Sequence, residues 1–247
     1  MPTFNIYHNM PKLLKFTHPD DFTTEIAYLI EEKILDAFDR NGLARIALSG
    51  SSTPLPIYQK LAESQVIPWD RLEIYLVDER FVPATDTLSN QKEISDIFGA
   101  NLTFIHAFET WNTNLTIQES SKIYNQNLEA ILDEEDFLFD LVILGMGTDG
   151  HTASLFPKDI STLHNTEELS TFTINSTGEP KERLTLTYHA LDKSDDIFVL
   201  LSGEEKVKTL EKVLSQEGDY FDYPIRKIID DHQNTTIFVL NENTKPE

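Results

Sequence analysis

The 247-residue chain contains no cysteine, which excludes disulfide bonds, thiolate metal ligands and a cysteine nucleophile together. It also has no apolar run approaching roughly 18 residues, the length typical of a membrane-spanning helix. The segment from Met1 to Lys15 mixes polar and apolar residues, unlike a secretory signal. We therefore expect a cytoplasmic protein without a membrane anchor.

Positive charge is scarce: 20 Lys and Arg oppose 42 Asp and Glu, and the formal net charge is −22. Nucleic acids and anionic membranes bind basic surfaces, so neither is an expected partner. An anionic small molecule would need a local basic island in this acidic field. The apolar content of 40%, with only 9 glycines and 11 prolines, predicts a packed globular core.

Helical and strand patterns alternate along the chain. Helices are predicted at residues 20–40, 55–62, 117–132 and 204–214. Strands are predicted at residues 45–48, 72–77, 138–144, 172–174, 184–188, 197–201 and 237–240. This alternation predicts an α/β fold: one Rossmann-like, doubly wound, mostly parallel sheet with helices on both faces. With no linker or repeat in the pattern, residues 1–247 are expected to form a single domain.

Three polar segments each begin where a predicted strand ends: residues 49–53, 78–80 and 145–151. Open parallel α/β sheets bind ligands in the crevice outside the carboxyl ends of their strands. The three segments are therefore expected to meet at one edge of the sheet and to form a ligand site there.

The third segment carries the strongest chemical signal. It holds Gly145, Gly147 and Gly150, together with Asp149 and His151. Histidine transfers protons near neutral pH, and a neighbouring carboxylate can fix its tautomer. As a general base without a covalent nucleophile, this pair suits either activation of water or deprotonation of carbon, and the residues alone leave both open.

Structural roles are the alternative for these side chains. A lone histidine is more often structural or exposed than catalytic, and Asp149 can form a turn by bonding its own backbone. The other six histidines show no metal-ligand spacing, so no metal site is expected. Ser154, three residues after His151, is expected to cap a short helical turn.

The first segment offers hydroxyls and backbone N–H groups ahead of a predicted helix: Ser49, Gly50, Ser51, Ser52 and Thr53. Such a loop favours phosphate, although an ordinary capped loop has the same composition.

The remaining charged candidates lie in two places. Arg80 can bind an oxyanion while one of the neighbouring acids holds the arginine in place. Alternatively, residues 78–80 are three solvated charges at the end of a strand. Lys181 and Arg183 are either a surface pair or a cationic clamp on a phosphate.

With these motifs in order, the chain from about residue 20 to about 215 resembles the 6-phosphogluconolactonases. The resemblance rests on residues 49–54, 78–83 with Ser89 and Asn90 following, 145–157 and 183–187. It implies hydrolysis of a phosphorylated sugar lactone, 6-phosphoglucono-1,5-lactone, to 6-phosphogluconate in the oxidative pentose phosphate pathway, without metal or organic cofactor. The oligomeric state is left open between a monomer and a small homo-oligomer.

The resemblance also implies roles by position. His151 activates water and later protonates the leaving ring oxygen, Asp149 orients it, and Arg80 assists the developing negative charge. Residues 49–53 and Arg183 hold the phosphate. Asp78, Asn90, Gly147 and Lys181 complete the predicted substrate site.

Two departures from the family pattern matter. Ser51 replaces the usual second glycine of the first loop, and a positive φ there would strain it by roughly 1–2 kcal/mol. Before Arg183 the sequence is Glu-Pro-Lys-Glu where the family often has Lys-Pro-Pro, which favours Arg183 over Lys181 as the phosphate ligand.

Two rival functions differ in testable features. Glucosamine-6-phosphate isomerase/deaminases resemble this chain but carry an aromatic residue in place of Arg80 and a carboxylate after the histidine turn. Here Leu155 and Phe156 stand at that point. A non-catalytic sugar-phosphate sensor would have lost Asp149 and His151, which are both present.

Overall fold

The computed structural model describes residues 11–241. The predicted domain 1–247 and the segment from Met1 to Lys15 therefore extend partly outside the described residues. Within 11–241, no helix combines the length and the apolar character needed to cross a membrane. Apart from Phe156, the buried apolar side chains of this part of the chain form one core cluster.

A seven-stranded sheet forms the centre, and every neighbouring pair of its strands is parallel, which confirms the predicted α/β class. In spatial order the strands are β1 (Lys12–Phe16), β10 (Thr235–Leu240), β9 (Ser194–Ser202), β6 (Phe139–Gly145), β2 (Ala44–Leu48), β3 (Leu72–Leu76) and β5 (Ala107–Glu109).

The strand order reverses between β2 and β6. From β2 the chain proceeds outward to β3 and β5, and from β6 it proceeds in the other direction to β9 and β10. The loops that leave β2 and β6 therefore diverge and open a crevice at the carboxyl ends of these two central strands. The polar segments 49–53 and 145–151 follow β2 and β6, so both lie at this switch point.

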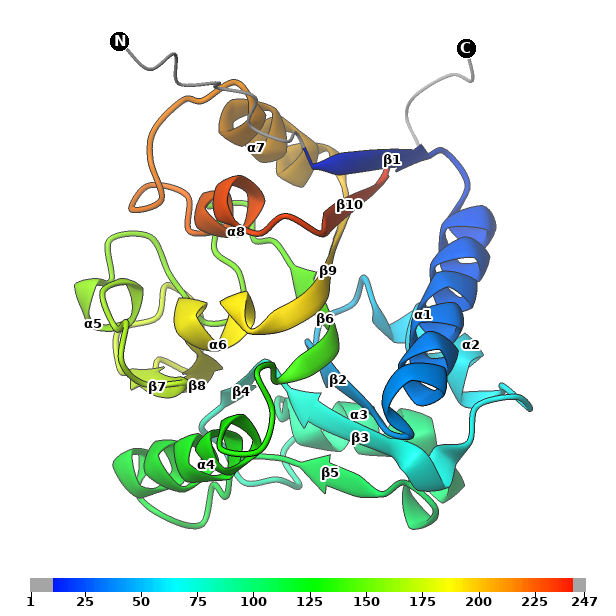
Figure 1. Cartoon of the computed structure of the whole chain (residues 1–247). Coiled ribbons are helices and arrows are strands. Elements are labelled where there is room, and N and C mark those ends of the chain that lie inside the picture. Colours follow the sequence, from blue (N-terminus) through cyan, green and yellow to red (C-terminus); the bar gives the residue numbers. More distant parts are fainter. Residues whose placement is uncertain (1–10, 242–247) are drawn as a thin grey trace, which may run out of the picture.

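Helices cover both faces of the sheet, as predicted (Figure 1). In that view α1 and α2 lie to the right of the strands, and α6 and α8 lie to the left. The helices are α1 (Pro19–Asn41), α2 (Leu55–Ala62), α3 (Asn90–Phe98), α4 (Ile117–Leu132), α5 (Ile160–Leu163), α6 (Tyr188–Asp192), α7 (Glu204–Leu214) and α8 (Ile225–Asp231), with 3-10 turns η1 (Trp69–Arg71) and η2 (Gly99–Thr103).

A second, antiparallel sheet was not predicted. Its three strands are β4 (Asp78–Arg80), β8 (Arg183–Leu186) and β7 (Ser170–Thr173), in that spatial order. The charged triplet 78–80, expected as a strand end, is thus itself a strand. Its pairing places Arg80 directly opposite Arg183. Two segments about a hundred residues apart in the sequence are thereby joined beside the crevice.

Other element boundaries differ from the predictions for local reasons. The predicted strand 184–188 ends at Leu186, because the Thr187 hydroxyl caps α6 by accepting a hydrogen bond from the N–H of Ala190 at 3.2 Å. The predicted stop after α1 is confirmed: Gly42 has a left-handed φ of 75°, and its N–H bonds to Phe38 O at 2.8 Å.

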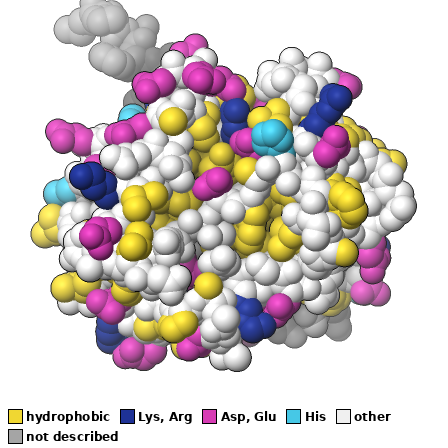
Figure 2. All heavy atoms as spheres, turned by 90° about the horizontal axis from the view of Figure 1, so that it is seen from below, with side chains coloured by type: hydrophobic (Ala, Val, Ile, Leu, Met, Phe, Trp, Pro, Cys, Tyr) yellow, Lys and Arg dark blue, Asp and Glu magenta, His cyan; other side chains and the backbone are white. Residues whose placement is uncertain are grey.

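Acidic side chains outnumber basic ones on the visible surface, as the net charge of −22 leads us to expect. Figure 2 shows Asp and Glu spread over the face seen from below, with fewer Lys and Arg among them. A cluster of cations at the crevice would therefore be a local exception.

Candidate active site

A cavity of about 480 Å³ opens at the switch point. Ten of the predicted site residues line it: Ser49, Gly50, Ser51, Asp78, Arg80, Asn90, Gly147, Asp149, His151 and Arg183. Ser52, Thr53 and Lys181 are not part of the lining. The three polar segments and the strand β8 thus meet around one cavity, as expected from their positions after the strands.

His151 and Asp149 form a hydrogen-bonded pair at the cavity wall. The distance from His151 Nδ1 to Asp149 Oδ1 is 2.6 Å, and the same oxygen accepts the backbone N–H of His151 at 3.2 Å. Asp149 is therefore both a turn former and a partner of the imidazole. Burial alone would raise the pKa of Asp149, but its hydrogen bonds to His151 and the charge of that ring lower it below the ordinary value.

The tautomer of His151 follows from this pairing. An ionised carboxylate only accepts hydrogen bonds, so the shared proton lies on Nδ1. The lone pair of Nε2 is then free to take a proton. Phe156 packs against the imidazole with ring centroids 4.8 Å apart, and it is buried.

Two glycines allow the close approaches in this site. A Cβ atom on Gly147 would lie 2.2 Å from His151 Nδ1, so any side chain there would displace the catalytic candidate. A Cβ atom on Gly50 would lie 2.0 Å from the Asn90 amide oxygen. The turn that carries His151 and the loop after β2 therefore need glycine at these two points.

An amide, rather than a carboxylate, holds the guanidinium of Arg80, which corrects the expectation that a neighbouring acid does so. Arg80 Nη1 donates to the side-chain oxygen of Asn90 and to Leu88 O. Asn90 is buried, and its Nδ2 donates to Asp78 O at 2.8 Å. Asp78 therefore acts on Arg80 through Asn90.

Glu79 fixes the backbone beneath this arrangement. Its buried carboxylate accepts the backbone N–H groups of Arg80 and Asn90 at 2.7 and 2.8 Å and that of Gln91 at 2.8 Å. Burial raises the pKa of Glu79, against the lowering effect of these donors. One acid thus joins β4 to the beginning of α3.

Ser154 does not cap a helical turn, contrary to the prediction. Its hydroxyl donates to Asp78 Oδ2 at 2.7 Å, and it is fully buried. The segment after His151 instead makes a tight turn closed by a bridge between Thr152 and Leu155. Ser154 and Asp78 both line the cavity, so Ser154 supports the Asp78 carboxylate in the cavity wall.

Arg183 brings a second guanidinium to the cavity. Its side chain is largely buried, and burial, together with the charge of Arg80, lowers its pKa against the opposing effect of Asp78. Lys181 points elsewhere: its Nζ donates to Ser176 O at 3.2 Å and lies 3.5 Å from a carboxylate oxygen of Glu179. The structure thus places Arg183, but not Lys181, at the cavity.

Lys206 is a cavity residue that the sequence analysis missed. It lies in the first turn of α7, after the carboxyl end of β9, and burial lowers its pKa. No ion pair or side-chain hydrogen bond within residues 11–241 involves its ammonium. In the sequence, the one feature that could have indicated Lys206 as a site residue is its position at the start of a helix that follows a strand. The two glutamates before it make that segment look like an ordinary charged surface helix. Lys206, Arg80 and Arg183 together form the local basic island.

The loop after β2 contributes an unpaired hydroxyl. Ser49 is 4% exposed and lines the cavity, and its Oγ has no hydrogen-bond partner within the described residues. A buried polar atom without a partner is costly, and a ligand oxygen in the cavity would satisfy it. The loop precedes the N-terminus of α2, as predicted.

Ser51 adopts the positive φ that would strain a residue other than glycine at this position of the family pattern. Its φ is 135°, in the region that favours glycine.

We expect Ser51→Gly to raise the free energy of unfolding by about 0.5–1 kcal/mol, because relief of strain exceeds the added entropy of the unfolded chain. Urea unfolding measures this change. Ser52→Gly, at an exposed position without a positive φ, is the matched control and should not stabilise the protein; equal effects of both changes would contradict strain at Ser51.

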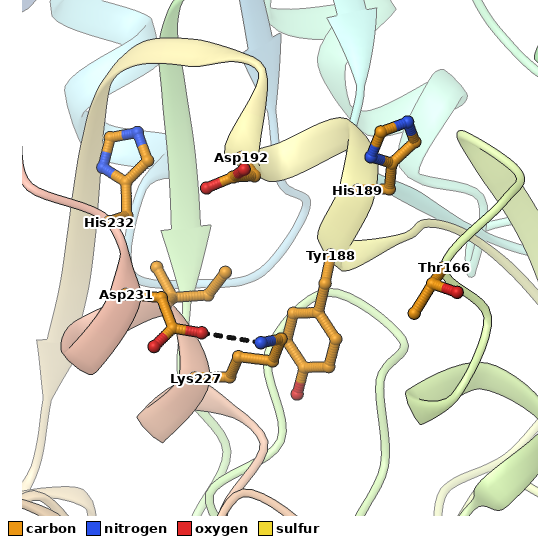
Figure 3. A pocket seen from close by; sticks show the side chains of 8 residues that line it. Thr166, Tyr188, His189, Asp192, Lys227, Asp231 and His232 are labelled. Atoms are coloured by element: carbon orange, nitrogen blue, oxygen red, sulfur yellow. Dashed lines mark hydrogen bonds and ion pairs between the residues drawn. The ribbon is translucent and has the colours of Figure 1, made fainter.

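A second cavity, of about 310 Å³, lies between α6 and α8 (Figure 3). Its walls come from α6 and α8, which precede β9 and β10. Its lysine, Lys227, is paired with Asp231 at 2.6 Å and lies 5.7 Å from the ring centroid of Tyr188. None of the predicted site residues is here, and the acidic rim formed by Asp192 and Asp231 disfavours an anionic ligand.

Within residues 11–241 there is no group of three or more His, Asp or Glu side chains that could hold a metal ion.

Known proteins resemble this chain over most of its length. A family model described as glucosamine-6-phosphate isomerases/6-phosphogluconolactonase matches residues 17–238. A 6-phosphogluconolactonase of Thermotoga maritima is 37% identical over 199 residues, covering 78% of this chain and 84% of the relative. One from Helicobacter pylori is 32% identical, covering 91% and 96%. The crystal structure of a 6-phosphogluconolactonase from Shewanella baltica superposes with a TM-score of 0.84 at 28% identity, covering 95% of this chain and 99% of that one.

Proposed function

The chain belongs to the family of glucosamine-6-phosphate isomerases and 6-phosphogluconolactonases, and from this premise we propose that it hydrolyses 6-phosphoglucono-1,5-lactone to 6-phosphogluconate. One observation carries the choice within the family: the His151–Asp149 pair faces a cation-lined cavity, and the side chain packed on the imidazole is the apolar Phe156 rather than a second carboxylate. Hydrolysis needs a base and a group that stabilises negative charge, and His151 and Arg80 can supply them.

We assign the phosphate to the basic end of the cavity. Arg183 can donate two N–H groups to phosphate oxygens, and Lys206 supplies a second, unpaired cation. The Ser49 hydroxyl, which lacks a partner, and the loop before α2 complete this subsite. Binding energy gained there would place the lactone carbonyl near His151.

The proposed reaction follows from the protonation states of the pair. His151 Nε2 removes a proton from water as the water oxygen attacks the lactone carbonyl carbon. Arg80 stabilises the negative charge that develops on the carbonyl oxygen. The bond between that carbon and the ring oxygen then breaks, and the imidazolium returns its proton to the ring oxygen. Asp149, kept ionised by its lowered pKa, stabilises the imidazolium between the two transfers.

The isomerase/deaminase alternative lacks a necessary group. Ring opening and amine transfer need a further carboxylate acting through the histidine, and Leu155 and Phe156 are buried and apolar at that point. We also propose that residues 1–247 form one domain, since the described apolar core is a single cluster.

The decisive assay uses freshly generated 6-phosphogluconolactone and glucosamine 6-phosphate. We expect the protein to accelerate lactone loss above the spontaneous rate and to release no ammonia from the amino sugar. Ammonia release would establish the deaminase alternative instead. Tight binding of 6-phosphogluconate without any acceleration would establish the sensor.

A further inference from the structure

The segment 174–182, between β7 and β8, is a compact loop held by its own hydrogen bonds. The buried Ser176 hydroxyl lies 2.9 Å from Gly178 O and 3.0 Å from Pro180 O, and the Ser176 N–H donates to Lys181 O at 3.2 Å. The loop is therefore a defined structure rather than a loose connection, and what its residues contact is fixed by these bonds.

The same loop holds Arg183. The Nε–H of Arg183 donates to Pro180 O at 2.9 Å, and Nη2 donates to Glu179 O at 3.1 Å. A guanidinium has five N–H donors, so three remain for a ligand. The position of the cation that we assign to the phosphate thus depends on the loop.

At its other end the loop reaches the pair that we assign to catalysis. The hydroxyl of Thr177 donates to Asp149 Oδ2 at 3.4 Å, while Asp149 Oδ1 bonds to His151. Thr177 and Gly178 both line the cavity. Each carboxylate oxygen of Asp149 therefore has its own partner, and one of the two partners belongs to the loop that holds Arg183.

We infer that Thr177 is a positioning residue: its hydroxyl orients Asp149 and thereby His151, so that one loop links the phosphate subsite to the general base. This inference rests on the proposed function. Partners that orient a catalytic side chain are effective because they limit its rotation. Here the partner of Asp149 is the neutral hydroxyl of Thr177 rather than a second charged group. Phosphate bound to Arg183 would steady the loop and the Thr177–Asp149 contact together.

The test compares Thr177→Val, which keeps the shape but removes the hydroxyl, with Thr177→Ser, which keeps the hydroxyl. We expect Thr177→Val to lower kcat about fivefold, equivalent to about 1 kcal/mol, with little change in KM. Thr177→Ser should restore kcat. Thr166→Val, an exposed threonine at the second cavity, is the matched control and should retain the kinetics of the wild type.

A second measurement does not depend on activity. The ring-nitrogen NMR shifts of His151 report which nitrogen carries the proton, and we expect the Nδ1–H form to lose population in Thr177→Val and to regain it in Thr177→Ser. Unchanged shifts in the valine variant, or a rise in KM at constant kcat, would overturn the positioning role. An inactive wild type would contradict the proposed function alone, because the NMR comparison would still decide the role of Thr177.

Discussion

Replacing His151 with alanine should lower kcat by about 10²–10⁴-fold, the range typical for loss of a general base. KM should change little, because we assign phosphate binding to Arg183, Lys206 and Ser49 rather than to the imidazole. We expect kcat to fall because water would have to attack the lactone carbonyl without a base to accept its proton. Arg80 would remain to stabilise the oxyanion, which leaves some activity above the spontaneous rate. Steady-state kinetics on freshly made lactone, corrected for spontaneous loss, gives both constants.

A suitable control is His189→Ala, in α6 at the second cavity. It removes an imidazole without touching the proposed site and should behave as the wild type does. If His151→Ala kept the wild-type kcat, the water-activation mechanism would be wrong, whatever the substrate. If it raised KM at constant kcat, His151 would be a binding group instead.

The part of the site that could be predicted is the part with local signals. A strand ending in closely spaced glycines, with Asp149 and His151 in the turn, indicates the position of a candidate general base. The choice of water as its partner comes from the family resemblance. Parallel strand order then brings the segments 49–53 and 145–151 together, because both follow central strands. Even the strain at Ser51 could be anticipated, since its neighbours define a loop that normally has glycine there.

The features of the fold and the site that the sequence did not predict depend on contacts between distant segments. β4 has only three residues, all charged, and it is a strand because β8 pairs with it from a hundred residues away. Thr177 lies in a loop without periodicity, and only the fold brings it to Asp149. Lys206 looks like one exposed charge among glutamates on a surface helix. Its burial at the cavity becomes visible only when β9 is placed beside β6.

The acidic field of the whole chain makes the local cations more important. With a net charge of −22, capture of an anionic substrate is opposed at long range. Salt screens such distant repulsion within about 10 Å at moderate ionic strength, whereas contacts inside a cavity are screened less. Affinity for the phosphate must therefore come from the few side chains that touch it, and among these Arg183 has a planar guanidinium that can bind two phosphate oxygens at once.

Arg183→Ala should accordingly raise KM by roughly 10²-fold, since truncating one partner of a desolvated charge pair costs about 2–5 kcal/mol. We expect kcat to fall much less, because His151 and Arg80 keep their places, although the loop 174–182 loses two hydrogen bonds to the guanidinium. Glucono-1,5-lactone, which lacks the phosphate, provides the internal comparison. On that substrate the variant and the wild type should have similar kcat/KM, because the group that Arg183 binds is absent.

Lys181→Ala separates this prediction from a general effect of positive charge near β8. Lys181 is two residues from Arg183 but contacts Ser176 O and Glu179 outside the cavity lining, so its removal should leave KM for the phosphorylated lactone nearly unchanged. A large rise in KM for Lys181→Ala and none for Arg183→Ala would reverse the assignment of the phosphate ligand. Equal losses on lactones with and without the phosphate would mean that Arg183 acts on the reacting carbonyl instead.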